Sequence, residues 1–325
     1  MSLLITSLLM SLIAALWVWV TGRKDPCGRP WLTALCLGLL LVLPLLALLP
    51  KVQVVMPRAE DAVASLSSWG MTGLLPIAWA AMALLMLLRI VRHHIALHRW
   101  LEQSDDVDPQ DWKPVLVECA ELLGLTKLPE MKIKSGLSSP VVARLFRPVI
   151  LLPICAHDWS DETRKMAILH ELGHLRRRDL WFRLAAEIAC ALHWYNPLVW
   201  WLRGKFLTQC EYACDALVVS AGADRKSYIS ALCDVVETAM AEARPPGAMA
   251  MADHAPLKLR VNRLLGGGRS GSSLLAITAA ILTTSTALGL SLLRPADVLE
   301  PLQEIGGYTP EEIDLRHSAN PFPGE

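Results

Sequence analysis

The sequence lacks a net charge, because its 325 residues include 31 lysines and arginines and 31 aspartates and glutamates. A chain without a basic excess is not drawn electrostatically to the nucleic-acid backbone. We therefore expect no direct nucleic-acid binding. The more informative feature is how the charges are distributed along the chain.

Charge is absent altogether from four stretches of about 20 residues, the length that an α-helix needs to cross the hydrocarbon core of a bilayer. The whole chain is 53% hydrophobic, with a mean hydropathy of +0.38, which is too apolar for an ordinary soluble protein. A cleaved signal peptide is the alternative for the first stretch, but Arg23 and Lys24 follow it instead of preceding it. We predict four transmembrane helices, over residues 2–20, 31–50, 69–88 and 272–293.

Basic residues beside these stretches predict the topology. They gather in residues 21–30, after residue 88 and before residue 272, and such segments face the cytoplasm by the positive-inside rule. The two termini then lie outside. None of the eight cysteines falls in an external segment, which fits a reducing cytoplasm and excludes a disulfide framework. The predicted domains are three transmembrane helices within residues 1–90, a cytoplasmic domain at 91–271, a fourth helix at 272–293 and a short external tail at 294–325.

The stretch His170-Glu171-Leu172-Gly173-His174 is an H-E-x-x-H motif. On a helix, residues i and i+4 lie on the same face, so His170 and His174 could bind one Zn²⁺ together. Glu171 is then placed to take a proton from a water molecule that the metal activates. The alternative is a structural helix that carries two histidines by chance. A third ligand distinguishes the two.

Four residues that follow the motif are candidates for this third ligand: His193, Glu187, Glu211 and Asp215. Glu211 is favoured because Glu211 and Asp215 are also four residues apart, so that one face of a second helix carries two carboxylates. One carboxylate can bind the metal, while the other accepts a hydrogen bond from a ligand histidine. We therefore predict Glu211 as the third ligand and Asp215 as the supporting carboxylate.

The predicted centre is a single zinc ion per chain, bound by His170, His174 and Glu211, with Glu171 as the general base. Peptide hydrolysis also requires a donor that stabilises the negative charge developing on the carbonyl oxygen. The sequence leaves three candidates for this donor: His193, Tyr195 and Tyr212.

Taken together, the apolar stretches, the H-E-x-x-H motif and the periodicity predict a mainly α-helical membrane protein with a cytoplasmic, zincin-like α+β metallopeptidase domain. Strand-like segments flank a turn near residues 144–147 and predict a small antiparallel sheet within residues 130–153. An edge strand beside the zinc helix could bind an extended substrate, and a plain structural hairpin is the alternative. Helices are expected over residues 113–124, 160–178, 204–221 and 225–242, and a loop over 243–258.

Residues 180–203 are unusually apolar, and Asn196-Pro197 interrupts them. We expect a helix that is buried in the domain or lies on the membrane surface. A fifth spanning helix is the alternative.

Several segments together resemble the BlaR/MecR-type antirepressor metallopeptidases. They are the motif with its continuation to Asp179, the segments 193–200 and 211–215, and the upstream segments 139–142 and 148–153. The resemblance covers roughly residues 1–295. It implies a multi-pass protein of the bacterial inner membrane whose cytoplasmic protease cleaves a winged-helix repressor and itself. It also implies the ligands, base and supporting carboxylate named above.

That family places an external penicillin-binding sensor domain after its last transmembrane helix. Here residues 294–325 follow the fourth apolar stretch, and they contain no S-x-x-K motif. We therefore expect a chain without this sensor. A separate sensor protein and a second copy of the chain are then candidate partners.

Two other functions stay open on the sequence alone. Membrane quality-control or processing proteases similar to HtpX or the CAAX prenyl proteases also combine H-E-x-x-H with a distant glutamate. A non-catalytic membrane receptor or scaffold that keeps a site-like fold is the second alternative, and zinc content distinguishes it from both enzymes.

Overall fold

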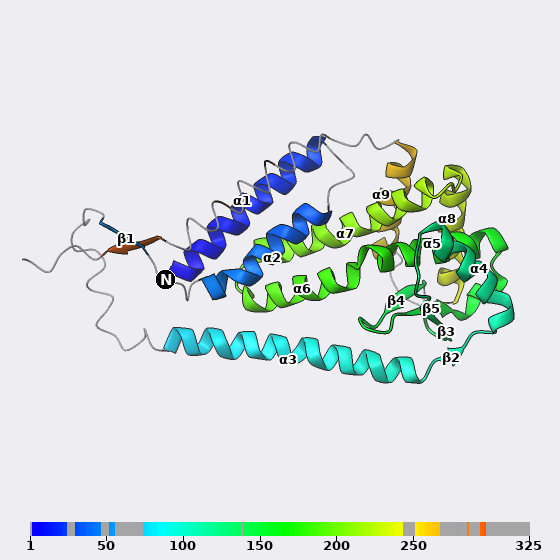
Figure 1. Cartoon of the computed structure of the whole chain (residues 1–325), viewed down its shortest axis with the longest axis horizontal. Coiled ribbons are helices and arrows are strands. Elements are labelled where there is room, and N and C mark those ends of the chain that lie inside the picture. Colours follow the sequence, from blue (N-terminus) through cyan, green and yellow to red (C-terminus); the bar gives the residue numbers. More distant parts are fainter. Residues whose placement is uncertain are drawn as a thin grey trace, which may run out of the picture.

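The computed structural model of the chain describes residues 2–24, 30–46, 52–55, 74–137, 139–242, 251–266 and 293–296, with the single residues 278 and 285. This part is mainly helical, and a small sheet lies at one end of a set of long helices (Figure 1). The helices are α1 (Ser2–Lys24), α2 (Pro30–Leu46), α3 (Leu74–Glu102), α4 (Pro109–Leu122), α5 (Asp161–Arg177), α6 (Asp179–Leu192), α7 (Pro197–Ser220), α8 (Arg225–Glu242), α9 (Met251–Leu265) and the 3₁₀ helix η3 (Ile154–Asp158). The strands are β1 (Val52–Val55), β2 (Asp105–Asp106), β3 (Glu130–Lys134), β4 (Val141–Ala143), β5 (Val149–Pro153) and β6 (Leu293–Ala296).

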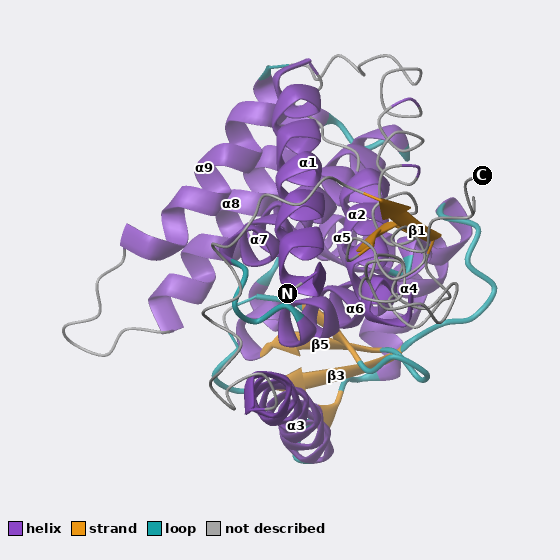
Figure 2. Ribbon diagram, turned by 90° about the vertical axis from the view of Figure 1, so that its left-hand side faces the viewer, coloured by secondary structure: helices purple, strands orange, loops and turns teal. Residues whose placement is uncertain are grey.

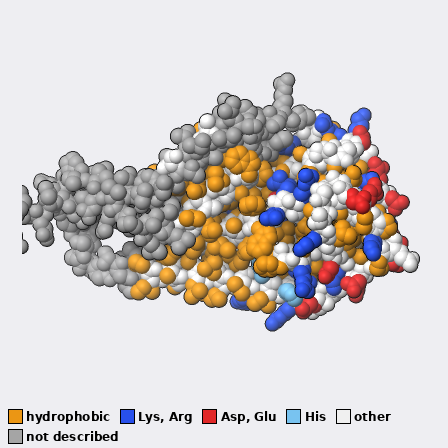
Figure 3. Space-filling model, in the orientation of Figure 1, with side chains coloured by type: hydrophobic (Ala, Val, Ile, Leu, Met, Phe, Trp, Pro, Cys, Tyr) orange, Lys and Arg blue, Asp and Glu red, His pale blue; other side chains and the backbone are white. Residues whose placement is uncertain are grey.

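The first three helices carry the apolar stretches of the N-terminal region. Among the described residues, the segment Pro76–Glu102 of α3 is long and apolar enough to cross a membrane, and α1 and α2 contain the shorter apolar segments Ser7–Trp19 and Pro30–Val42. Figure 3 shows hydrophobic side chains over the middle of the molecule and charged side chains gathered at the end that holds the sheet. The predicted fourth transmembrane helix, 272–293, lies almost entirely outside the described residues, as does most of the predicted tail.

The pair formed by α6 and α7 lies between α1 and α2 on one side and α3 on the other (Figures 1 and 2). Its residues share one apolar core with α1 and α2. Residues 180–203 form most of α6 and the start of α7. They pack against the apolar helices α1 and α2, a contact that the sequence did not specify. This core contains Met10, Ala14, Val18, Cys36, Leu37, Leu40, Ala186, Ala189, Cys190, Val199, Leu202, Phe206 and Cys210.

Buried polar side chains at the turn between α6 and α7 hold it against α1 and α2. Asn196 donates hydrogen bonds to the hydroxyl of Ser11 at 2.9 Å and to the backbone oxygen of Ser7 at 3.3 Å. The Nε2 atom of His193 lies 2.8 Å from the backbone oxygen of Leu40, and its Nδ1 atom lies 2.9 Å from the hydroxyl of Ser7. Unpaired polar groups are costly in apolar surroundings. These contacts therefore favour one arrangement of the helices.

Helix α5 is the centre of the end that holds the sheet, where it contacts α4, α6, α7 and α8. Its start is fixed by Ser160, whose hydroxyl oxygen accepts a hydrogen bond from the backbone N of Thr163 at 3.1 Å, a normal N-cap. Its end is fixed by Arg178, which adopts the left-handed conformation with φ 58°. The chain thus reverses over a single residue and starts α6 at Asp179.

The four-stranded sheet has the order β2-β3-β5-β4, and it is mixed. The predicted antiparallel sheet is therefore wrong in one pairing: β5 is antiparallel to β4 but parallel to β3. The reason is that β5 inserts between β3 and β4, and all five of its residues, Val149–Pro153, are buried. A continuous apolar strand of this kind belongs in the middle of a sheet, and this leaves β4 at the edge.

The helix predictions hold for α4, α5 and α7 with shifted bounds, and for α8 with the bounds predicted. The loop predicted over residues 243–258 is wrong from Met251 onward, where α9 begins. Residues 243–250 lie outside the described part. This difference matters, because α9 supplies a residue of the candidate site.

Candidate metal centre

The H-E-x-x-H motif lies on α5, as its spacing predicts. The rings of His170 and His174 lie on one face of the helix, with their centroids 5.0 Å apart. His170 and Glu171 are buried, at 7% and 8% exposure. The motif thus projects from the most enclosed helix of the domain, which excludes most of the surrounding water from it.

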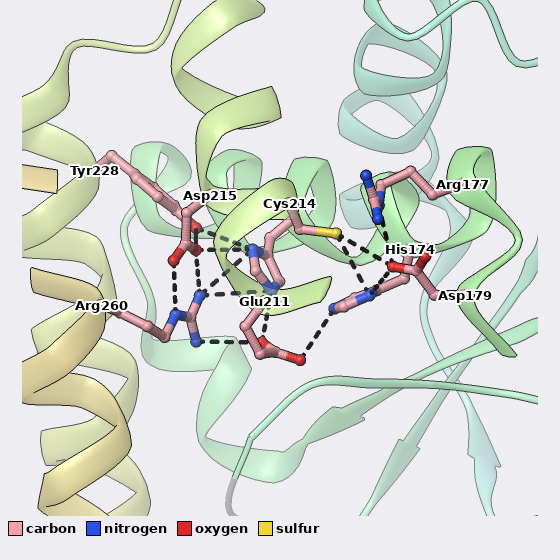
Figure 4. A network of polar contacts seen from close by, with 9 residues as sticks. His174, Arg177, Asp179, Glu211, Cys214, Asp215, Tyr228 and Arg260 are labelled. Atoms are coloured by element: carbon pink, nitrogen blue, oxygen red, sulfur yellow. Dashed lines mark hydrogen bonds and ion pairs between the residues drawn. The ribbon is translucent and has the colours of Figure 1, made fainter. Parts of the chain in front are cut away.

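Helix α7 brings Glu211 to the two histidines (Figure 4). Its Oε2 atom lies 3.3 Å from Nε2 of His170, and its Oε1 atom lies 3.5 Å from Nε2 of His174. At the motif itself, Gly173 faces α7, and a Cβ atom built there would lie 3.4 Å from the Sγ atom of Cys214, an ordinary van der Waals contact. The two helices therefore pack closely at the motif, where Glu211 meets the two histidines.

This donor set fits a zinc ion. The ligand atoms of His170, His174 and Glu211 all lie within 4.8 Å of one another. Two ligands about 2.0–2.1 Å from a tetrahedral ion stand about 3.3–3.4 Å apart, which matches the two N···O distances above. Three protein ligands of this type leave a fourth position open, and this is the pattern of a catalytic zinc site.

Each ligand histidine is held through its other ring nitrogen by a buried carboxylate. Nδ1 of His170 lies 3.3 Å from Oδ1 of Asp215, and Nδ1 of His174 lies 2.9 Å from Oδ2 of Asp179. Such contacts fix the tautomer that leaves Nε2 free for the metal. Asp215 thus lies beside His170 and four residues after Glu211 on α7. Asp179 also pairs with an arginine, because Nε of Arg177 donates to it at 3.2 Å.

Sequence reasoning missed two residues of this network, Tyr228 on α8 and Arg260 on α9 (Figure 4). The hydroxyl of Tyr228 donates to Oδ1 of Asp215 at 2.7 Å and lies 3.0 Å from Nδ1 of His170. Arg260 donates from Nε to Oδ2 of Asp215 at 2.9 Å, and its Nη1 atom lies 3.6 Å from Oε2 of Glu211. The only signal for Arg260 in the sequence is a basic flank of a transmembrane stretch, which predicts topology and no contact with the site.

The charges of this network act on the protonation of the ligands. Burial raises the pKa of Glu211, but the hydrogen bond with His170 and the charges of His170, His174 and Arg260 outweigh it and lower that pKa to about 2. Burial and Arg260 lower the pKa of His170, and its hydrogen bonds with Asp215 and Glu211 outweigh both and raise it to about 9. The negative charges of Glu211 and Asp215 thus favour a cation at this place. In the absence of a metal ion, they stabilise the protonated form of His170.

A cavity of about 520 Å³ opens in front of the two histidines, Glu171 and Glu211. Its polar end is formed by these four residues. Edge strand β4 lines another side of it, and α8 supplies an apolar wall. The apolar lining residues from these elements include Val141, Val142, Ala231, Leu232, Val235 and Val236.

The other predicted residues do not come together at this cavity. His193 is bonded to Ser7 and Leu40, and Tyr195 lies beside it, with its hydroxyl 3.4 Å from Nδ1 of His193. Tyr212 follows Glu211 on α7, and its ring stacks under the guanidinium of Arg263, 4.2 Å away. None of the three candidates for the oxyanion donor lines the cavity, and neither does Glu187, which pairs with Arg203 at 3.2 Å.

Comparison with known proteins agrees with this geometry. Residues 42–264 match the BlaR1 peptidase M56 family. The regulatory protein BlaR1 of Bacillus licheniformis is 32% identical over 93 residues, which cover 29% of this chain and 15% of that protein. The methicillin resistance mecR1 protein of Staphylococcus aureus strain Mu50 is 29% identical over 86 residues, which cover 26% of this chain and 15% of that protein. The aligned parts are thus a small fraction of each relative, whereas the family match spans most of this chain, which includes both site helices. This chain belongs to the BlaR1 peptidase M56 family.

Proposed function

We propose that the chain is a membrane-embedded zinc endopeptidase that acts in signal transduction by cleaving a cytoplasmic transcriptional repressor. The observation that carries this proposal is the convergence of His170, His174 and Glu211 beside Glu171 at the polar end of a cavity. Membership of a BlaR1-type peptidase family supports the signalling role.

The proposed metal is one zinc ion, held by His170, His174 and Glu211. When bound, it supplies a water molecule acidified toward neutrality and polarises the scissile carbonyl. Asp215 and Asp179 hold the two imidazoles in the orientation that leaves each Nε2 atom free for a metal ligand bond.

Glu171 is the proposed general base. It lines the cavity, and in the described part of the chain its carboxylate forms no hydrogen bond or ion pair, so that it stays available to a water molecule. It would accept the proton of the attacking water and pass it to the nitrogen of the leaving amine, as general acid–base catalysis requires. Its burial favours the transfer, because little bulk water competes for the proton.

The proposed substrate is an extended peptide segment with apolar side chains. Among the strands that the structure describes, β4 pairs with β5 alone, so its other side is an unpaired edge, and β4 lines the same cavity as Glu171. Backbone groups of an edge can pair with an added strand, while the apolar wall formed by α8 receives side chains. A loop or linker of a repressor that can become extended fits these two requirements.

We further propose that the catalytic end faces the cytoplasm of a bacterial inner membrane. The domain limits proposed are those expected above, with transmembrane helices within residues 1–90 and at 272–293, around a peptidase domain at 91–271. The basic residues after the apolar part of α3 support this orientation, because such clusters remain on the cytoplasmic side.

Comparison of the wild type with Glu171→Gln tests the function. Both forms are expressed at equal levels, and new N-termini in the cytoplasmic proteome are mapped by mass spectrometry. We expect a new N-terminus within a DNA-binding repressor in the wild type only, while both purified forms contain about one zinc per chain. Equal cleavage by the variant would exclude Glu171 as the base.

The same experiment separates the alternatives. New N-termini confined to misfolded membrane proteins would assign the chain to quality control and contradict the signalling role. An absence of zinc from both forms, with identical proteomes, would favour a non-catalytic scaffold.

A further inference from the structure

A second cavity, of about 290 Å³, lies away from the metal centre, between α3, α6 and α7. Its walls come from all three helices. The lining residues are Met86, Arg89, Ile90 and His93 of α3, Glu187, Cys190 and Ala191 of α6, and Trp200 and Arg203 of α7. No residue of the metal centre contributes to it.

The cavity has a polar end and an apolar end. Helices α3 and α7 run toward the catalytic end of the molecule and α6 runs away from it (Figure 1). On α3, Arg89 and His93 therefore lie nearer the catalytic end than Met86. On α7, Arg203 lies nearer than Trp200. On α6, Glu187 lies nearer the catalytic end than Cys190 and Ala191. The charged lining residues of the three helices therefore gather toward that end, where Ile90 is the apolar lining residue among them.

The charge at the polar end is incompletely compensated. Glu187 and Arg203 form an ion pair at 3.2 Å. Arg89 forms no ion pair with any residue that the structure describes, and its side chain is exposed. The polar end thus carries an excess positive charge, while the apolar end offers a thioether, a thiol and an indole ring.

The surroundings of the cavity suit a lipid. The outer face of α3 beside it is apolar and open, with Leu84, Leu85 and Leu88 at 57%, 59% and 49% exposure. The apolar part of α3 ends at Arg89, and Arg92 and His93 follow within one turn. A basic pocket between helices at the cytoplasmic boundary is the type of site that binds the head group of an anionic phospholipid.

We propose that this cavity binds one anionic phospholipid of the cytoplasmic leaflet. Arg89 and Arg203 contact the phosphate, His93 adds a hydrogen-bond donor, and the first carbons of the acyl chains lie against Met86 and Trp200. The remainder of the chains runs along the exposed apolar face of α3. The proposal rests on the membrane location of α3 and is independent of peptidase activity.

Native mass spectrometry of the full chain in a neutral detergent tests this proposal, with phosphatidylglycerol and phosphatidylcholine of identical chains as probes. We expect the wild type to bind phosphatidylglycerol at least fivefold more tightly than phosphatidylcholine. Arg89→Gln should lower the affinity for phosphatidylglycerol about fivefold, the equivalent of about 1 kcal/mol for one basic residue at an anionic surface. Arg89→Lys should retain most of the affinity.

The matched control is Arg99→Gln, which removes the same charge about 15 Å further along α3, outside the cavity. It should change the affinity less than twofold. Equal losses in Arg89→Gln and Arg99→Gln, or equal binding of the two lipids by the wild type, would overturn the proposal. Displacement of the lipid by millimolar glycerol 3-phosphate would also overturn it, because the site would then recognise a soluble phosphate.

Discussion

At the scale of single residues, the proposed metal centre consists of two layers of side chains with different tasks. Nε2 of His170, Nε2 of His174 and the carboxylate of Glu211 point toward one position, while Asp215 and Asp179 hold the opposite ring nitrogens. A direct ligand supplies a bond to the metal, whereas a supporting carboxylate supplies orientation and basicity. The two layers should therefore respond differently to substitution.

We predict a graded loss of zinc affinity. Glu211→Ala should leave no stoichiometric zinc, because two ligands remain. Asp179→Asn should weaken zinc binding about 10–100-fold, the usual effect of losing a carboxylate that supports a histidine. Competition titration with a zinc chelator measures both constants.

The control for this series is Asp111→Asn on α4, at an exposed position remote from the site. It should bind zinc like the wild type. A Glu211→Ala variant that retains one zinc per chain would show that Glu211 is not a ligand. An Asp179→Asn variant with wild-type affinity would show that the contact with His174 has no role in metal binding.

At the scale of elements, the site depends on how closely α5 and α7 pack. Gly173 is the point of approach, since a Cβ atom there would lie 3.4 Å from Sγ and 3.5 Å from Cβ of Cys214. A single methyl group thus reaches ordinary contact distance, and anything larger must displace α7. Because Cys214 lies three residues after Glu211, such a displacement moves the ligand.

Gly173→Ala and Gly173→Val should therefore change the stability of the protein in opposite directions. The alanine variant should be neutral or stabilised by up to about 1 kcal/mol, because glycine is a poor residue inside a helix. The valine variant should be destabilised by about 1–3 kcal/mol, as overpacked cores are, and should bind zinc more weakly. Denaturant unfolding and zinc titration measure the two effects, and a valine variant with wild-type zinc affinity would contradict this account of the packing.

The sequence predicts some of these elements better than others, for physical reasons. The i,i+4 spacing within a helix places His170 beside His174, and Glu211 near Asp215, without any knowledge of the fold. Arg260 and Tyr228 reach the site only because α8 and α9 pack against α5 and α7, and no local pattern encodes that packing. The pairing of β5 escaped prediction for the same reason, since a buried apolar strand does not specify its neighbours.

At the scale of the whole molecule, α7 connects the apolar N-terminal helices with the catalytic end. The apolar residues of 180–203 indicate burial, but they do not reveal which surface buries them. The structure shows α6 and α7 packed on α1 and α2 while α7 continues to Glu211. Asn196 lies directly before α7, where α7 meets α1. It is fully buried, caps α7 and donates to Ser7 and Ser11.

Asn196→Ala should destabilise the protein by about 2–4 kcal/mol, because the variant loses a helix cap and leaves buried polar partners unpaired. If the molecule is one body, the thermal unfolding temperature in detergent and the zinc content should fall together. Asn262→Ala, at an exposed position of α9, is the control. Two separate unfolding transitions, with zinc binding retained in the second, would show that the N-terminal helices and the catalytic end fold independently.

Because α7 is one continuous helix, a tilt at its start also moves Glu211 further along it. Glu211 lies fifteen residues beyond Asn196 on α7, and at about 1.5 Å per residue this span is about 22 Å. A tilt of only about 3° around the anchored end would shift the carboxylate by about 1 Å, whereas productive sites tolerate about 0.5 Å. A small change in how α1 and α2 pack against the start of α7 would therefore be enough to displace Glu211 from the two histidines, without any direct contact at the candidate site.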